Sequence, residues 1–159
     1  MTISDDHTAL ESIDADIASD SAAVISMVAL FEDILGDAIR NHLVALSKTQ
    51  DADLFGDRGP LATFSSKIDV GYALGLYGKE TKAKLHLIRK IRNIFAHRHG
   101  AQTFDHKDVR RLCNNLPPTA DESTPLRSRF NAALVTITLR TDRHLRAAQR
   151  PVAPPADLP

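Results

Sequence analysis

The sequence predicts an all-α protein that folds as a single helical bundle of four to five helices. Apolar residues recur at intervals of three and four along several segments, which is the period of an amphipathic helix. The connections between these segments are short and contain glycine, proline or aspartate, as in bundles of neighbouring helices. The β-branched run at residues 135–138 is too isolated to form a sheet, so it is interpreted as helix. A chain of 159 residues is expected to form one domain with loose ends.

The chain begins with residues 1–19, which are rich in aspartate and serine and are expected to form an acidic flexible arm, with a helix near Leu10–Ile17 as the alternative. The helical domain is expected to span residues 20–148. Its first helix is predicted at residues 21–46, with Ser21 as the N-cap. Residues 47–62 are interpreted as a connection. The inward face of the first helix is predicted from its apolar spacing to consist of Val24, Val28, Phe31, Leu35, Ile39 and Leu43.

The second helix is predicted at residues 65–76, with Thr63 among its candidate caps. Gly71 and Gly75 are four residues apart on it, and this spacing indicates the close approach of another backbone. The third helix is predicted at residues 79–97. Its inward residues are predicted to be Leu87, Ile91, Ile94 and Phe95.

The fourth helix is predicted to be short and to cover residues 105–116, because the prolines at 117–118 end it. Cys113 on this helix is interpreted as a small buried hydrophobic residue. A long last helix is predicted at residues 122–148. Residues 149–159 contain four prolines and are expected to form a Pro-rich tail.

Composition bounds the class of protein. A single cysteine cannot form an internal disulfide, which fits a reducing compartment, and no apolar run is long enough to span a bilayer. We therefore expect a cytoplasmic protein that does not associate with membranes. The net charge is zero, but residues 1–60 carry an excess of acidic side chains and residues 61–159 an excess of basic ones. This asymmetry indicates either an anion-binding half shielded by an acidic arm or two halves that attract each other.

The helix at residues 79–97 brings Arg92, Asn93 and His97 close together: Asn93 and His97 are four apart and share one face, and Arg92 lies beside them with a side chain long enough to reach His97. These groups suit phosphodiester cleavage without a metal. A neutral imidazole can move a proton, an arginine can hold the phosphate, and an amide can orient either group. The same residues also make a structural element, in which Asn93 bonds a neighbouring loop and His97 satisfies carbonyl groups at the end of the helix.

A stripe of basic residues on the same helix could contact a phosphate backbone. Arginines of the last helix, among them Arg127 and Arg129, are interpreted as a solvated face or as intersubunit pairs. The residues predicted to bind nucleic acid or a partner are Lys82, Arg89, Lys90, Arg92 and Arg98.

Common cofactor and metal motifs are absent from the sequence. It contains no GxxxxGK[ST], GxGxxG or GxSxG pattern, and its histidines do not follow the spacing of zinc sites. No helix-turn-helix pattern is visible either. We therefore expect no cofactor and no metal site.

Three stretches, Gly59–Leu76, Leu87–His97 and Thr103–Leu116, occur in an order that resembles the mannitol operon repressor (MltR) family. The resemblance covers roughly residues 29–116, about half of the chain. The Arg-Asn-x-x-x-His core is also similar to the R-x4–6-H signature of HEPN-type helical domains, many of which cut RNA. The resemblance implies a HEPN-like bundle.

The resemblance implies a non-enzymatic, cytoplasmic transcriptional regulator of the repressor type. Such a protein would act as a helical homodimer that binds a protein partner or nucleic acid. The alternative is a HEPN-like metal-independent endoribonuclease of the toxin type. In that case His97 would be the acid or base, Arg92 would hold the phosphate, and Asn93 would orient the reacting groups.

Overall fold

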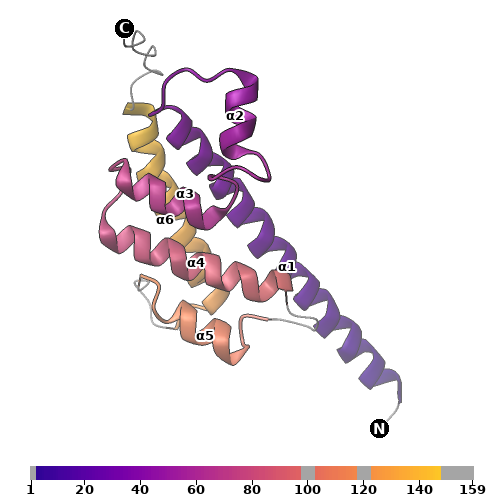
Figure 1. Ribbon diagram of the computed structural model, residues 1–159. Helices are drawn as coiled ribbons and strands as arrows, with labels where there is room; N and C mark the ends of the chain where they lie inside the picture. Colours follow the sequence, from indigo (N-terminus) through magenta and orange to yellow (C-terminus); the bar gives the residue numbers. More distant parts are fainter. Residues whose placement is uncertain (1–2, 98–102, 118–122, 148–159) are drawn as a thin grey trace, which may run out of the picture. The chain divides into compact units, whose positions relative to one another are not determined.

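The computed structural model describes residues 3–97, 103–117 and 123–147, with side chains described for 19–96, 103–117 and 123–140. This part of the chain is helical and contains no strand, so the prediction of an all-α fold is confirmed (Figure 1). That the helices form a HEPN-like arrangement stays a prediction. The helices are α1 (Ile3–Arg40), α2 (Lys48–Phe55), α3 (Phe64–Ala73), α4 (Lys79–His97), α5 (Lys107–Cys113) and α6 (Leu126–Ala147).

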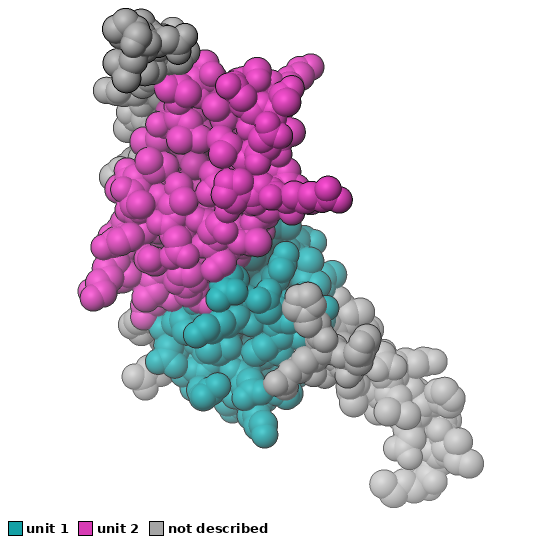
Figure 2. Space-filling view, in the orientation of Figure 1, with its two compact units in different colours: residues 1–29, 87–134 teal, residues 30–86, 135–159 magenta. Residues whose placement is uncertain are grey.

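The chain divides into two compact units (Figure 2). Unit 1 consists of residues 1–29 and 87–134, and unit 2 consists of residues 30–86 and 135–159. The division falls within α1, α4 and α6, so each of these helices contributes residues to both units.

Aromatic stacking marks the core of unit 1. The ring of Phe104, in the loop before α5, lies 5.3 Å from the ring of Phe95 on α4 and 5.7 Å from that of Phe130 on α6. Such separations are typical of favourable aromatic pairs. All three rings are buried, so they fix the loop before α5 against the two helices. Other buried residues of this core are Val24, Val28, Ile88, Ile91, Val109, Cys113, Leu116 and Leu134.

Unit 2 is built on α1 and α3. The rings of Phe31 and Phe64 meet edge to face at 6.1 Å, and Lys67 Nζ lies 2.7 Å from the carboxylate of Glu32. Both charged side chains are mostly buried, so the ion pair ties the two helices together beside their apolar contact. Other buried residues of unit 2 include Leu35, Ile39, Leu61, Ile68, Leu76, Leu85 and Ile137.

The described residues form six helices rather than the four to five that the sequence predicts, and several bounds differ: α1 ends at Arg40 rather than at residue 46, and α3, α5 and α6 are shorter than predicted. The helical backbone of α1 begins at Ile3 rather than at Ser21, because the spacing of Leu10, Ile13 and Ile17 continues the helical period through the Asp-rich segment. The interpretation of residues 47–62 as a connection is wrong in part, because α2 lies within it. The flexibility expected for residues 1–19 stays a prediction, and residues 149–159 lie outside the described part of the chain.

The α2 helix depends on its cap rather than on an apolar face. Ser47 accepts a hydrogen bond from the backbone N–H of Gln50, and the Gln50 side chain accepts one from the backbone N–H of Ser47. This reciprocal arrangement is a capping box. None of the helix residues is buried, which is why hydrophobic periodicity does not reveal the helix.

The glycines predicted on the second helix have different roles. Gly71 is buried on α3, and a Cβ atom there would lie 2.6 Å from Tyr77 Oη and 3.1 Å from Leu35 Cδ1. The predicted close approach is therefore found at Gly71, although side chains make it rather than a backbone. Gly75 lies beyond the end of α3, where its φ of 75° lets the chain turn toward α4.

Candidate cationic surface on α4 and α5

The α4 helix begins and ends at the residues that the sequence predicts. Its inward row in unit 1 is Ile88, Ile91 and Phe95, which are almost fully buried. The prediction that Leu87 and Ile94 point inward is therefore only partly right, because both are half-buried. The prediction is confirmed for Ile91 and Phe95, and Ile88 takes the inward place that was expected for Leu87. This row determines which polar side chains remain at the surface of the helix.

Two members of the predicted Arg-Asn-His group lie together. Arg92 Nη1 donates a hydrogen bond to Asn93 Oδ1 at 3.3 Å, and both side chains are half-buried. His97 is the last residue of α4, but its side chain lies outside the described part of the structure, as does all of Arg98. The structure therefore brings Arg92 and Asn93 together and leaves the place of the imidazole a prediction.

The arginines of α4 have unused hydrogen-bonding capacity. The Nε atoms of Arg89 and Arg92 are buried, and neither has a hydrogen-bond partner among the residues that the structure describes. A buried donor that lacks an acceptor costs about 1–3 kcal/mol.

A shallow hollow of about 370 Å3 lies between α4 and α5 in unit 1. Lys90 and Asn93 line it from α4, and Asp108 and Arg111 line it from α5. Lys90 and Arg111 are exposed. The hollow therefore presents two cations and an amide beside one carboxylate, a set of groups that suits an anionic partner.

Local capping places α5 at this hollow. The Nδ1 atom of His106 accepts a hydrogen bond from the backbone N–H of Asp108 at 3.3 Å, at the start of the helix. Buried Val109 and Cys113 hold α5 against the core of unit 1. The basic side chains Lys107, Arg110 and Arg111 stay exposed. Sequence reasoning missed them as binding candidates, because it treated the predicted fourth helix only as an apolar element.

Lys82, the remaining candidate, belongs to unit 2 and is engaged there. Its Nζ atom lies 2.8 Å from Asp69 Oδ1 and 4.9 Å from the centre of the Tyr72 ring. The hydrogen bond from Lys82 holds the pKa of Asp69 below its ordinary value. His86 also lies near this carboxylate, with Nε2 at 3.4 Å from Oδ1. These contacts give Lys82 a role within unit 2.

Among the residues that the structure describes, no group of three or more His, Cys, Asp or Glu side chains is placed to hold a metal ion. None of the helices in the described part of the chain combines the length and the apolar character needed to cross a membrane.

Comparisons with known proteins do not identify a family. No family model matches the chain, and no match is found among curated proteins or solved structures.

Proposed function

We propose that this chain is a non-enzymatic regulatory protein of the mannitol operon repressor type. It lowers transcription as a homodimer by binding a protein partner or nucleic acid through the cationic surface of α4 and α5. We define this cationic surface as Arg89, Lys90, Arg92, Lys107, Arg110 and Arg111, with Asn93 among them.

What supports the proposal most directly is the charge of this surface. Residues 87–97 and 103–117 contain six lysines and arginines but only two acidic residues, Asp105 and Asp108. Basic side chains gathered on adjacent helices attract a polyanion through many weak contacts, which release counterions from it.

The test compares two variants of equal charge change. In Lys90→Glu/Arg111→Glu, both substitutions lie at the hollow between α4 and α5, and both side chains are exposed, so the fold is expected to survive. The matched control is Arg58→Glu/Lys79→Glu, in which the substituted residues are exposed and belong to unit 2. Each protein is returned to a strain of the native host that lacks the gene, and transcripts are counted.

Deletion of the gene is expected to raise the level of certain transcripts. Wild type and the control variant are expected to bring these transcripts back to their original level, and Lys90→Glu/Arg111→Glu is expected to leave them raised. Purified protein is then tested for binding to DNA from upstream of those genes. If wild type binds this DNA and Lys90→Glu/Arg111→Glu does not, the partner is nucleic acid. If wild type represses transcription but does not bind the DNA, the partner is a protein. Full repression by Lys90→Glu/Arg111→Glu would refute the proposal for this surface.

The proposed homodimer has a separate test. Sedimentation equilibrium of the purified wild-type chain is expected to give twice the mass of 17.4 kDa. A monomer at the protein concentrations that repress transcription would contradict this part of the proposal.

A metal-independent endoribonuclease is the second candidate, and the hydrogen bond between Arg92 and Asn93 favours it. That bond holds a phosphate-binding group and an amide one turn before His97 on the same helix. The test incubates a mixed RNA pool with purified protein and excess EDTA. Cleavage that is lost in His97→Ala, with helicity unchanged, would make the protein a nuclease. Intact RNA with wild-type protein would refute this candidate.

A further inference from the structure

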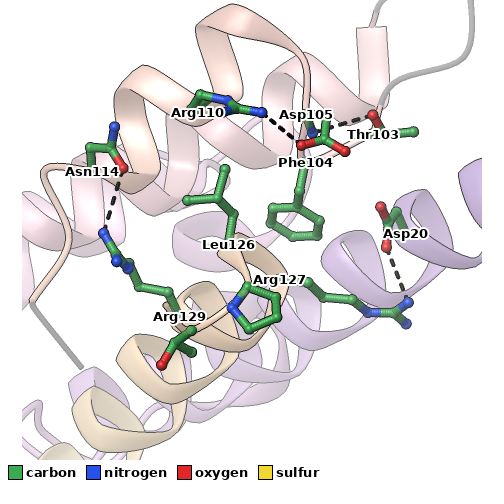
Figure 3. Close-up of a pocket in the computed structure, with 11 residues that line it drawn as sticks. Asp20, Thr103, Phe104, Asp105, Arg110, Asn114, Leu126, Arg127 and Arg129 are labelled. Atoms are coloured by element: carbon green, nitrogen blue, oxygen red, sulfur yellow. Dashed lines mark hydrogen bonds and ion pairs between the residues drawn. The ribbon is translucent and has the colours of Figure 1, made fainter. Parts of the chain in front are cut away.

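A second hollow lies in unit 1, apart from the one between α4 and α5. Its volume is about 650 Å3, within the range of about 300–1,000 Å3 that is typical of small-molecule sites. It lies among Asp20 of α1, the loop before α5, α5 itself and the start of α6 (Figure 3). None of its lining residues lines the other hollow.

Three arginines surround this hollow. Figure 3 shows Arg110, Arg127 and Arg129 around Leu126 and Phe104. Arg110 comes from α5 and the other two come from the first turns of α6. Two carboxylates, Asp20 and Asp105, also line the hollow, so one positive charge is in excess among the lining residues.

Each arginine is oriented by another residue of the same hollow. Arg110 Nη2 lies 2.8 Å from Asp105 Oδ1, and Arg127 Nη1 lies 3.1 Å from Asp20 Oδ1. Arg129 Nη1 donates to Asn114 Oδ1 at 3.5 Å. A guanidinium has five N–H donors, so Arg110, which is exposed and pairs with Asp105, keeps donors for a ligand.

The start of α6 adds to the positive potential. Pro125 and Leu126 line the hollow, and the first hydrogen bond of α6 runs from the N–H of Arg129 to the carbonyl of Pro125. The N–H groups of the residues before Arg129 therefore have no partner within the helix. With 22 residues, α6 is long enough to develop the full dipole, which favours an anion at this end.

The hollow also has an apolar side. Phe104 contributes to it while its ring stacks between Phe95 and Phe130, so this wall is fixed by the core. Leu126 is half-buried beside it. A ligand that filled this space would place an apolar body against Phe104 and Leu126, and its anionic group would lie among the arginines.

We propose that this hollow binds a small organic phosphate monoester. The guanidinium groups hold the phosphate oxygens, and Phe104 and Leu126 contact the carbon body. A phosphate monoester fits better than a carboxylate for two reasons. It carries about −1.5 to −2 charge at neutral pH, and its three terminal oxygens can accept from several arginine forks. Arg110 is common to this hollow and to the α4–α5 cationic surface, but the proposal is argued from the lining of this hollow and not from the function proposed for that surface.

The experiment is calorimetric titration of the full chain with phenyl phosphate, inorganic phosphate, benzoate and benzyl alcohol. Phenyl phosphate is expected to bind saturably and at least tenfold more tightly than any of the other three probes. Equal affinity for inorganic phosphate would overturn the role of the apolar wall, and equal affinity for benzoate would overturn the phosphate assignment. Absence of saturable phenyl phosphate binding would overturn the site.

Variants locate the binding. Arg110→Glu is chosen because Arg110 and its partner Asp105 are both exposed. Loss of the Arg110 guanidinium therefore leaves no buried charge without a partner. It is expected to weaken phenyl phosphate binding at least tenfold, whereas Arg58→Glu, an equal charge change in unit 2, leaves the affinity unchanged. Equal weakening by both variants would overturn the proposal, because only the net charge would then matter.

A spectroscopic readout needs no variant. In the wild-type protein, phenyl phosphate is expected to shift the amide signals of Asp105, Leu126 and Arg127, while the signal of Arg58 stays in place. Shifts confined to other parts of the chain would overturn the assignment to this hollow.

Discussion

The guanidinium of Arg127 lies 3.1 Å from the carboxylate of Asp20, and this ion pair joins the start of α6 to α1 within unit 1. The Asp20 side chain is only 13% exposed, whereas that of Arg127 is 45% exposed. Arg127 also donates to the hydroxyl of Ser19 at 3.3 Å. A largely buried carboxylate therefore depends on one half-exposed cation.

Removal of that cation is expected to destabilise the protein. Arg127→Ala leaves the carboxylate of Asp20 buried and without an ion-pair partner among the described residues, and the free energy of unfolding of the protein is expected to fall by about 1–3 kcal/mol. The measurement is urea denaturation followed by circular dichroism. Arg110→Ala is the control, because it breaks an ion pair whose two side chains are exposed and is expected to cost at most about 1 kcal/mol. Equal losses in the two variants would contradict the idea that the burial of Asp20 decides the cost.

Gly71 gives a prediction about packing in unit 2. A methyl group added there would lie too close to Tyr77 Oη, which donates to the carbonyl of Ile68 at 2.8 Å. Gly71→Ala is therefore expected to lower the free energy of unfolding by about 1–3 kcal/mol. In the background of Tyr77→Phe the offending oxygen is absent, so Gly71→Ala is expected to cost less there. Equal costs in both backgrounds, measured by thermal or urea unfolding, would contradict the contact.

The single thiol gives a prediction about reactivity and pH. Burial raises the pKa of Cys113 to about 11, while Arg129 has a smaller opposing effect. The thiolate is the reactive form, so iodoacetamide is expected to modify the native protein far more slowly than the urea-unfolded chain. Rapid modification of the native protein at neutral pH would show that the thiol is accessible.

The same burial links stability to pH. The pKa of the Cys113 thiol is about 8.5 in the unfolded chain and about 11 in the folded protein. Stability from this group is therefore fully present below about pH 8.5 and is lost as the pH rises through the folded pKa. Cys113→Val is expected to remove this alkaline component of the urea midpoint. An unchanged pH profile in the variant would contradict it.

Among the helices of the described residues, α4 is the one whose two ends the sequence predicts correctly. The bounds of α4 are predicted correctly because Gly78 precedes its basic, amphipathic sequence. Periodicity still leaves its inward face uncertain by one position, since Leu87 and Ile88 both fit rows of three and four. Ile88 is the residue buried in the core of unit 1. Its burial depends on residues that are distant in sequence, which the local pattern does not contain.

The candidate sites differ in how much of them a sequence can reveal. Arg92 and Asn93 are adjacent in the chain, so their association is visible as a motif. The Arg127–Asp20 pair joins residues that are far apart in sequence, and no periodicity links them. The interpretation of the α6 arginines as a solvated face or intersubunit pairs therefore missed the hollow that Arg127 and Arg129 line.

Lys82 can be assigned to a structural or a binding role by one variant. Its hydrogen bond is the main cause of the lowered pKa of Asp69, so Lys82→Gln is expected to raise that pKa toward its ordinary value. Because the folded pKa is depressed, the stability from this carboxylate is present above its ordinary pKa and is lost as the pH falls through the folded value. NMR titration of the Asp69 carboxyl measures the shift directly.

The same variant tests whether Lys82 belongs to the cationic surface. If the role of Lys82 is confined to the contacts with Asp69 and Tyr72, the Lys82→Gln variant is expected to repress transcription as wild type does. It then differs from wild type only in how its stability falls at acidic pH. A loss of repression comparable to that of Lys90→Glu/Arg111→Glu, with the pKa of Asp69 unchanged, would give Lys82 the binding role that the sequence predicts. The two outcomes separate because one readout depends on a carboxylate within unit 2 and the other depends on a partner outside the chain.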